Sequence, residues 1–190
     1  MAAQDAVLAG ARTKGQDLVS SLILITPAFF WSERFKSIIQ FLSTAVFSIL
    51  SEFNIAPDLR RPFAPLPLQI SDFTSLPQWQ EFIEGDPLRT TKVSLNYGMV
   101  SQAMQDLSLQ AVVDVEVPIF FALAEQDRIV DNANGLQLAK AALGRSPLSR
   151  IAFFDTEHAI HFAKADELAK EIHSFIHGIA NSARLIASPS

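Results

Sequence analysis

The sequence contains no cysteine, which excludes disulfides, thiolate metal ligands and a cysteine nucleophile. It also lacks internal repeats and a glycine-rich phosphate-binding loop. Basic residues are few, since 15 Lys and Arg stand against 20 Asp and Glu and give a net charge of −5. This balance argues against a nucleic-acid partner, which would need clustered positive charge.

A long hydrophobic run is missing as well. The longest apolar stretch, residues 38–50, is interrupted by four polar side chains and falls short of the roughly 20 residues that a membrane-spanning helix needs. The N-terminal segment, residues 1–7, carries an acid where a secretory signal peptide is basic and then apolar. We therefore expect a soluble, cytoplasmic protein, and the 49% hydrophobic content is sufficient for one core.

The first half of the chain predicts a helix, a strand and a second helix before an irregular connection. Residues 2–13 are rich in alanine, and the compact apolar run 18–26 ends at a proline, as a buried parallel strand does. Apolar side chains recur at helical spacing over residues 35–53. Six prolines within residues 54–87 predict that this segment is irregular.

The second half alternates helical and strand patterns, which is typical of a parallel sheet with helices on its faces. The last helix has a clear apolar face, the helical pattern over 93–107 is weakened by Gly98, and each strand is a short run of apolar residues. The tail from residue 181 is expected to fray. The expected elements are helices over 93–107, 133–143 and 163–178 and strands over 119–124 and 149–154.

Two of these strands are followed by residues capable of proton chemistry. Asp127 follows the strand 119–124, and His158 follows the strand 149–154. The carboxyl ends of parallel strands meet at one edge of a sheet, so Asp127 and His158 can lie close together there. Asp127 either orients the histidine or caps its own loop, and His158 is either a base or a surface turn residue. Asp131 is the better candidate for capping the helix that follows.

Other histidines compete with His158. His161 lies one helical turn away but deeper in the predicted helix, so we place it second. His158 and His161 have neither the spacing nor the intervening glutamate of a zincin metal site. His173 and His177 have i, i+4 spacing, but on the solvent side of an amphipathic helix. We expect no metal site.

Taken together, residues 118–131 and 153–161 resemble the C-terminal half of the α/β-hydrolase family. The closest branch is that of the monoacylglycerol lipases and lysophospholipases, which are similar to serine aminopeptidases of the S33 type. Two further segments resemble this branch, residues 22–27 as a strand that enters a cap and residues 85–88 as a motif inside the cap. The implied fold is the C-terminal part of an α/β-hydrolase domain, in one incomplete domain over 1–190. Its parts are core residues 1–27, a helical cap insertion over 28–108, and core residues 109–190.

By this resemblance, Asp127 is the acid and His158 the general base of a serine hydrolase that cleaves carboxylic esters through an acyl-enzyme and uses no cofactor. The substrate is then a small hydrophobic or acyl ester. Ala124 stands where the family usually has glycine. The Gly-x-Ser-x-Gly nucleophile elbow of the family is absent, and the internal serines, including Ser20, Ser21 and Ser101, do not follow a strand as that elbow does.

The resemblance also suggests where the nucleophile lies. In this branch the elbow is followed by an alanine-rich helix, and Met1 opens such a helix here. Our hypothesis is that Met1 is the residue directly after the nucleophile, with its backbone N–H in the oxyanion hole. A misplaced start codon or a truncated gene would produce this beginning. The chain alone is then expected to be inactive, and its strand over residues 22–27 to expose an edge that favours self-association.

Two alternatives remain open. The chain is either a non-catalytic binding or interaction domain on a hydrolase scaffold, or a non-functional gene fragment. A peripheral lipid contact through the cap is a further expectation. Phe41 and Phe47 lie off the apolar stripe of the helix predicted over 35–53, and they either pack under a loop or face an apolar ligand or lipid.

Overall fold

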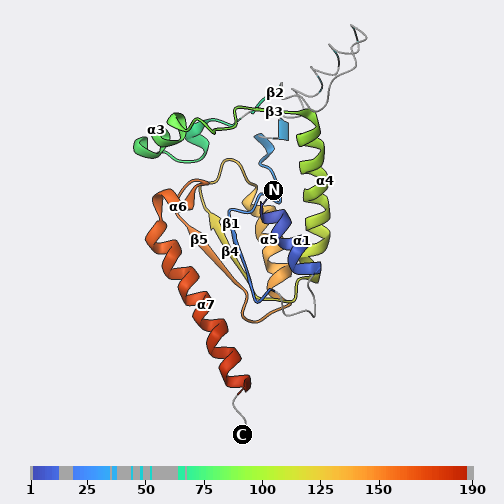
Figure 1. Cartoon of the computed structure of the whole chain (residues 1–190), viewed down its shortest axis with the longest axis vertical. Coiled ribbons are helices and arrows are strands. Elements are labelled where there is room, and N and C mark those ends of the chain that lie inside the picture. Colours follow the sequence, from blue (N-terminus) through green and yellow to red (C-terminus); the bar gives the residue numbers. More distant parts are fainter. Residues whose placement is uncertain are drawn as a thin grey trace.

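Three parallel strands form the centre of the computed structural model (Figure 1). It describes residues 2–12, 19–34, 36–37, 44, 48, 52, 64–66 and 68–187. The strand order is β1 (Leu22–Ile25), β4 (Ile119–Ala124), β5 (Arg150–Phe154). The register pairs Leu22 with Ile119 and Ala124 with Phe154. The predicted fold class, parallel strands with flanking helices, is confirmed.

β4 lies in the middle of the sheet and is buried along its whole length. Because successive side chains of a strand point to opposite faces, β4 contributes to two separate hydrophobic clusters. Ile119 and Phe121 belong to one cluster, and Phe120, Ala122 and Ala124 belong to the other. This double burial explains why the sequence of β4 is a continuous apolar run rather than an alternating one.

Helices cover both faces of the sheet (Figure 1). One face packs against α1 (Ala2–Arg12) and α5 (Asn132–Leu143), with α4 (Leu95–Ala111) lying against α1. The other face packs against α7 (Ala165–Ala187), which follows the short α6 (Ile160–Ala163). Gly10 permits the close approach of α1 to the sheet, since a Cβ there would lie 3.1 Å from a methyl carbon of Leu22.

The structure extends two of the predicted helices. α4 reaches residue 111 in spite of Gly98, and its first turn is capped by Ser94, whose hydroxyl accepts a hydrogen bond from the Tyr97 amide at 3.1 Å. α7 continues to Ala187, whereas we expected fraying from residue 181. The side chains of α7 that pack on the sheet, Leu168, Ile172, Phe175 and Ile179, all precede this extension.

A smaller layer lies over the carboxyl ends of the strands (Figure 1). It contains the antiparallel pair of β2 (Ala64–Pro65) and β3 (Lys92–Val93) and the helix α3 (Pro77–Gly85), with a 3-10 turn at Ile70–Asp72. A second 3-10 turn, Val112–Asp114, follows α4. We expected an irregular connection up to residue 87, and α3 corrects this, since Pro77 is tolerated in the first turn of a helix. Most of the helix predicted over 35–53, including Phe41 and Phe47, lies outside the described residues.

β1 forms one side of the sheet. In the part of the chain that the structure describes, β1 pairs only with β4, and its Ile23 and Ile25 side chains are each 37% exposed. Both point to the α7 face, because they pair with Phe120 and Ala122, whose side chains belong to that face. The self-association expected at this edge stays a prediction.

Candidate active site

Asp127 and His158 lie side by side at the carboxyl ends of β4 and β5. His158 Nδ1 and Asp127 Oδ2 are 2.8 Å apart, and the Asp127 side chain is fully buried whereas that of His158 is 19% exposed. The two loops are joined by backbone hydrogen bonds from Glu125 N to Phe154 O (2.9 Å) and from Gln126 N to Thr156 O (3.0 Å). The strand register therefore extends into the loops and sets the meeting of the two side chains.

The two oxygens of Asp127 have different partners. Oδ2 faces His158, while Oδ1 accepts hydrogen bonds from the backbone amides of Ile129 (2.8 Å) and Val130 (2.9 Å). The two interpretations left open by the sequence, a loop cap and a partner of histidine, are both present in the geometry. Rigid fixation of the carboxylate by its own loop is what an orienting acid requires.

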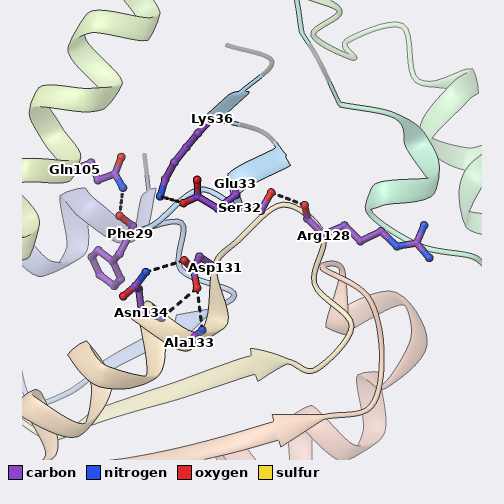
Figure 2. A network of polar contacts seen from close by, with 9 residues as sticks. All are labelled: Phe29, Ser32, Glu33, Lys36, Gln105, Arg128, Asp131, Ala133 and Asn134. Atoms are coloured by element: carbon purple, nitrogen blue, oxygen red, sulfur yellow. Dashed lines mark hydrogen bonds and ion pairs between the residues drawn. The ribbon is translucent and has the colours of Figure 1, made fainter. Parts of the chain in front are cut away.

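The loop after Asp127 is held from the other side by the segment that follows β1. Ser32 donates hydrogen bonds through its amide to Ile129 O and through its hydroxyl to Arg128 O, both at 2.8 Å. Figure 2 shows the hydroxyl contact, with the Arg128 side chain pointing away from it. Asp131 N also donates to Phe30 O at 2.9 Å. Asp127 therefore stands on a loop that is fixed at several points.

Asp131 caps α5 as predicted. Its Oδ1 accepts hydrogen bonds from the amides of Asn134 (3.1 Å) and Ala133 (3.0 Å), and its Oδ2 accepts one from the Asn134 side chain (Figure 2). The amide of Asn134, followed by the other hydrogen bonds, lowers the pKa of Asp131. Asp131 is thus occupied with the helix end, which leaves Asp127 as the acid next to His158.

A segment of the upper layer holds the His158 loop. The Phe73 ring meets the His158 ring edge to face at 5.8 Å, and Phe73 O accepts a hydrogen bond from Ala159 N at 2.9 Å. Glu157 is buried, which by itself raises a carboxyl pKa, but hydrogen bonds from Ser75 and the charge of Arg128 lower the pKa of Glu157 overall. The His158 ring is therefore positioned by contacts from outside its own loop.

His158 opens onto a cavity of about 530 Å³ between the sheet and the upper layer. The wall is mostly apolar, and His161 belongs to it as well. The rings of His161 and Phe162 have centroids 4.3 Å apart, and partial burial, together with the nearby charge of His158, lowers the pKa of His161. Only His158 is hydrogen-bonded to Asp127, so the geometry separates the two histidines that the sequence left in competition.

Thr26 is a residue that the sequence did not single out. It directly follows β1, lines the same cavity, and has a backbone φ of 42°. A left-handed conformation is strained for a β-branched residue. Its amide nevertheless donates to Ala122 O at 2.8 Å, so the adjoining strand holds the strained turn in place. The only local signal was a strand that ends directly before Pro27.

The remaining candidates lie apart from this cavity. Ser101 is buried in α4, and neither Ser20 nor Ser21 lines the cavity. The two histidines at positions 173 and 177 are exposed on α7 with ring centroids 4.2 Å apart. Within the described residues, no group of three or more potential metal ligands occurs. Met1 lies outside the described residues, so its predicted role in the oxyanion hole stays a prediction.

Comparison with known families shows the family of the chain. A family model described as serine aminopeptidase, S33, matches residues 5–180. The chain belongs to this family. The resemblance to α/β-hydrolases read from the sequence is thereby confirmed for this S33 family member. A search of curated proteins finds no match.

Solved structures of α/β-hydrolases share the fold of this S33 family member. A monoacylglycerol lipase from Paleococcus ferrophilus has a TM-score of 0.74 at 14% identity, covering 93% of this chain and 65% of its own. A second match is a soluble variant of monoglyceride lipase from Saccharomyces cerevisiae, solved with a substrate analogue. Its TM-score is 0.62 at 14% identity, and the match covers 84% of this chain and 52% of the lipase chain. E-2-(acetamidomethylene)succinate hydrolase has a TM-score of 0.53 at 16% identity, and the match covers 92% of this chain and 63% of the hydrolase chain.

The chain therefore spans less than two thirds of the length of these structures. At such identities the likeness shows the fold and does not carry an activity over. None of the helices that the structure describes is both long and apolar enough to span a membrane.

Proposed function

We propose that Asp127 and His158 are the acid and the general base of a serine hydrolase that cleaves carboxylic esters of lipase or lysophospholipase type. The observation that carries this proposal is the 2.8 Å contact between Asp127 Oδ2 and His158 Nδ1, with the carboxylate buried and the ring at a mostly apolar cavity. Charge pairs on protein surfaces are seldom fixed in this way, whereas catalytic pairs are.

The chemistry follows from which ring nitrogen is occupied. Asp127 accepts the Nδ1 proton and leaves Nε2 of His158 free to act on a substrate. A serine hydroxyl attacks the ester carbonyl while Nε2 takes its proton, and the resulting imidazolium is stabilised by Asp127. His158 then returns the proton to the leaving alcohol, and a water repeats the sequence to release the acid from the acyl-enzyme.

The cavity favours an acyl chain over a polar substrate. Its wall includes Leu66, Leu68, Ile70, Phe73, Ile83 and Phe162, and its volume lies in the range of pockets that bind small ligands. Two of the similar structures are a monoacylglycerol lipase and a monoglyceride lipase. An ester of a single-chain fatty acid is therefore the substrate that we propose for this site.

The nucleophile is the missing part of this proposal. The sequence holds no Gly-x-Ser-x-Gly elbow, and the hydroxyls that line the cavity belong to threonines 26, 90 and 91. We propose that the serine comes directly before Met1 in the intact protein, so that the Met1 amide helps to form the oxyanion hole. The DNA directly upstream of the Met1 codon tests this, because an in-frame Gly-x-Ser must end there.

A fluorophosphonate probe tests the catalytic assignment. We expect no covalent labelling of the 190-residue chain, and we expect labelling of a chain extended by the upstream codons. Asp127→Asn and His158→Ala should abolish labelling of the extended chain, while His161→Gln should leave it in place. Labelling of the 190-residue chain that disappears in Thr26→Val would show that Thr26 is the nucleophile and would overturn our proposal.

A binding domain on the hydrolase scaffold is the second candidate, and the absent elbow favours it. A stop codon or an unrelated sequence upstream of Met1 would support this reading, or that of a gene fragment without function.

We also propose a cytoplasmic location, lipid contact through the cap, and self-association through the edge of β1. A monodisperse monomer in sedimentation velocity would overturn the self-association.

A further inference from the structure

The loops that carry Asp127 and His158 are each held by a segment from outside the sheet. The exit segment, residues 29–34, follows β1 and donates two hydrogen bonds from Ser32 to carbonyls of the Asp127 loop. The clasp, residues 69–75, belongs to the upper layer and contacts the His158 loop. A general base has to be held at a fixed position relative to its acid, so any contact between these two segments bears on the pair.

The clasp reaches His158 and the residues on both sides of it. Phe73 O accepts a hydrogen bond from Ala159 N at 2.9 Å, and the centroid of the Phe73 ring lies 5.8 Å from that of the His158 ring. On the other side, Ser75 donates hydrogen bonds to the buried Glu157 carboxylate. A displacement of the clasp would therefore move the backbone on both sides of the imidazole.

An ion pair joins the exit segment to the clasp. Arg34 Nη1 donates to Asp72 Oδ1 at 2.8 Å, and the Asp72 side chain is 4% exposed. The other carboxylate oxygen of Asp72, Oδ2, accepts a hydrogen bond from Gln69 N at 2.9 Å across the 3-10 turn. Removing the cation would leave this buried carboxylate without its opposite charge, which is strongly unfavourable. The turn would then move to bring Asp72 to water, and Phe73 follows Asp72 directly in the chain.

We propose that Arg34 and Asp72 are positioning residues for the acid and the base of this site. Through Ser32 the exit segment holds the loop of the acid, and through the ion pair it holds the clasp, which holds the base. One segment of the chain thereby fixes both partners. The inference rests on the proposed function, because it concerns what aligns the same acid and base. Neither Arg34 nor Asp72 lines the cavity, so their effect is on the orientation of the imidazole rather than on the substrate.

NMR spectroscopy of the full 190-residue chain tests this without a nucleophile. The ring nitrogen signals of His158, recorded at alkaline pH where the ring is neutral, show which nitrogen carries the proton. The exchange rate of the Ala159 amide reports the contact with the clasp, and that of the Phe121 amide in the central strand reports global unfolding. The ratio of the two exchange rates separates a local effect from a general loss of stability.

Three variants are compared with the unmodified chain. Arg34→Gln removes the cation at a half-exposed position, and Arg34→Lys restores a cation there. Lys36→Gln is the matched control, because it removes the neighbouring ion pair of Lys36 with Glu33 (Figure 2). That pair has the same length of 2.8 Å, but it joins residues only three positions apart.

We expect Arg34→Gln to raise the exchange rate of the Ala159 amide about tenfold relative to that of Phe121, since a charge-assisted hydrogen bond from a partly exposed donor is lost. His158 should then populate both neutral tautomers, whereas its proton should stay on Nδ1 in the unmodified chain, in Arg34→Lys and in Lys36→Gln. Equal acceleration of both amides, no acceleration in Arg34→Gln, or the same change in Lys36→Gln would overturn the positioning role while leaving the pair intact. If His158 of the unmodified chain carries its proton on Nε2, the proposed hydrolase function fails instead.

Discussion

Replacing Asp127 by alanine separates its two roles. The substitution leaves the amides of Ile129 and Val130 without an acceptor, and both residues are at most 3% exposed. A buried donor without a partner costs about 1 to 3 kcal/mol, and loss of the contact with His158 adds about 1 kcal/mol. With two such donors, the free energy of unfolding should therefore fall by about 3 to 7 kcal/mol, a large part of the roughly 5 to 15 kcal/mol of an ordinary domain.

Asp127→Asn and His158→Ala are the matched comparisons. Asparagine keeps an oxygen for the two loop amides, and His158→Ala removes only the contact with Oδ2. Each of these two substitutions should lower the free energy of unfolding by about 1 to 2 kcal/mol. Equilibrium urea unfolding of the three variants, followed by circular dichroism, measures the differences. If Asp127→Ala and His158→Ala cost the same, Oδ1 does not hold the loop, and the division of the carboxylate between loop and histidine is wrong.

Three further predictions concern the stability of the fold. Phe121→Ala, on the central strand and 1% exposed, should lower the free energy of unfolding by about 3 to 5 kcal/mol, whereas Phe153→Ala, at a side chain 50% exposed, should cost less than about 1.5 kcal/mol in the same urea titration. Thr26→Gly should raise the free energy of unfolding by about 0.5 to 1 kcal/mol, since relief of the left-handed strain exceeds the added flexibility of the unfolded chain; a loss of stability would contradict the strain. The folded state lowers the pKa of His161 below its ordinary value of 6.5, so the unfolded chain binds more protons and stability should fall as pH is lowered from about 7 to 5.5. His161→Gln should flatten this dependence, and an unchanged slope would contradict it.

Much of the fold was predictable because each core element carries its own pattern. The strand over residues 119–124 and the helix that follows it are defined by apolar periodicity alone, and the structure has them within one or two residues, whereas the helix before the strand ends four residues later than predicted, at Ala111. The α3 helix was not predicted, because the prolines around it outweighed a short apolar face, although Pro77 is compatible with a helix start. The end of α7 was misplaced, because the apolar pattern that defined the helix stops at Ile179 whereas the helix continues to Ala187.

For the site, residue types and their places after strands identified Asp127 and His158 as neighbours. The choice between His158 and His161 needed coordinates, since one helical turn separates them in sequence and only hydrogen-bond geometry distinguishes them. The sequence did not single out Thr26, Phe73 or Arg89. Each joins the site only because the fold brings it next to parts of the cavity wall that are distant in sequence. No local pattern marks a contact of this kind.

The sequence by itself determined the parallel strands and the aspartate and histidine that follow them, because hydrophobic periodicity and order along the chain are local properties; the family was indicated by the resemblance of those segments to known hydrolases. Only the tertiary structure decided that the two oxygens of Asp127 serve different partners, that a segment of the upper layer positions His158, and that Arg34 and Asp72 join this segment to the one that follows β1. These relations depend on how loops far apart in sequence meet at the end of the sheet, and that meeting is set by strand register and packing rather than by any residue alone.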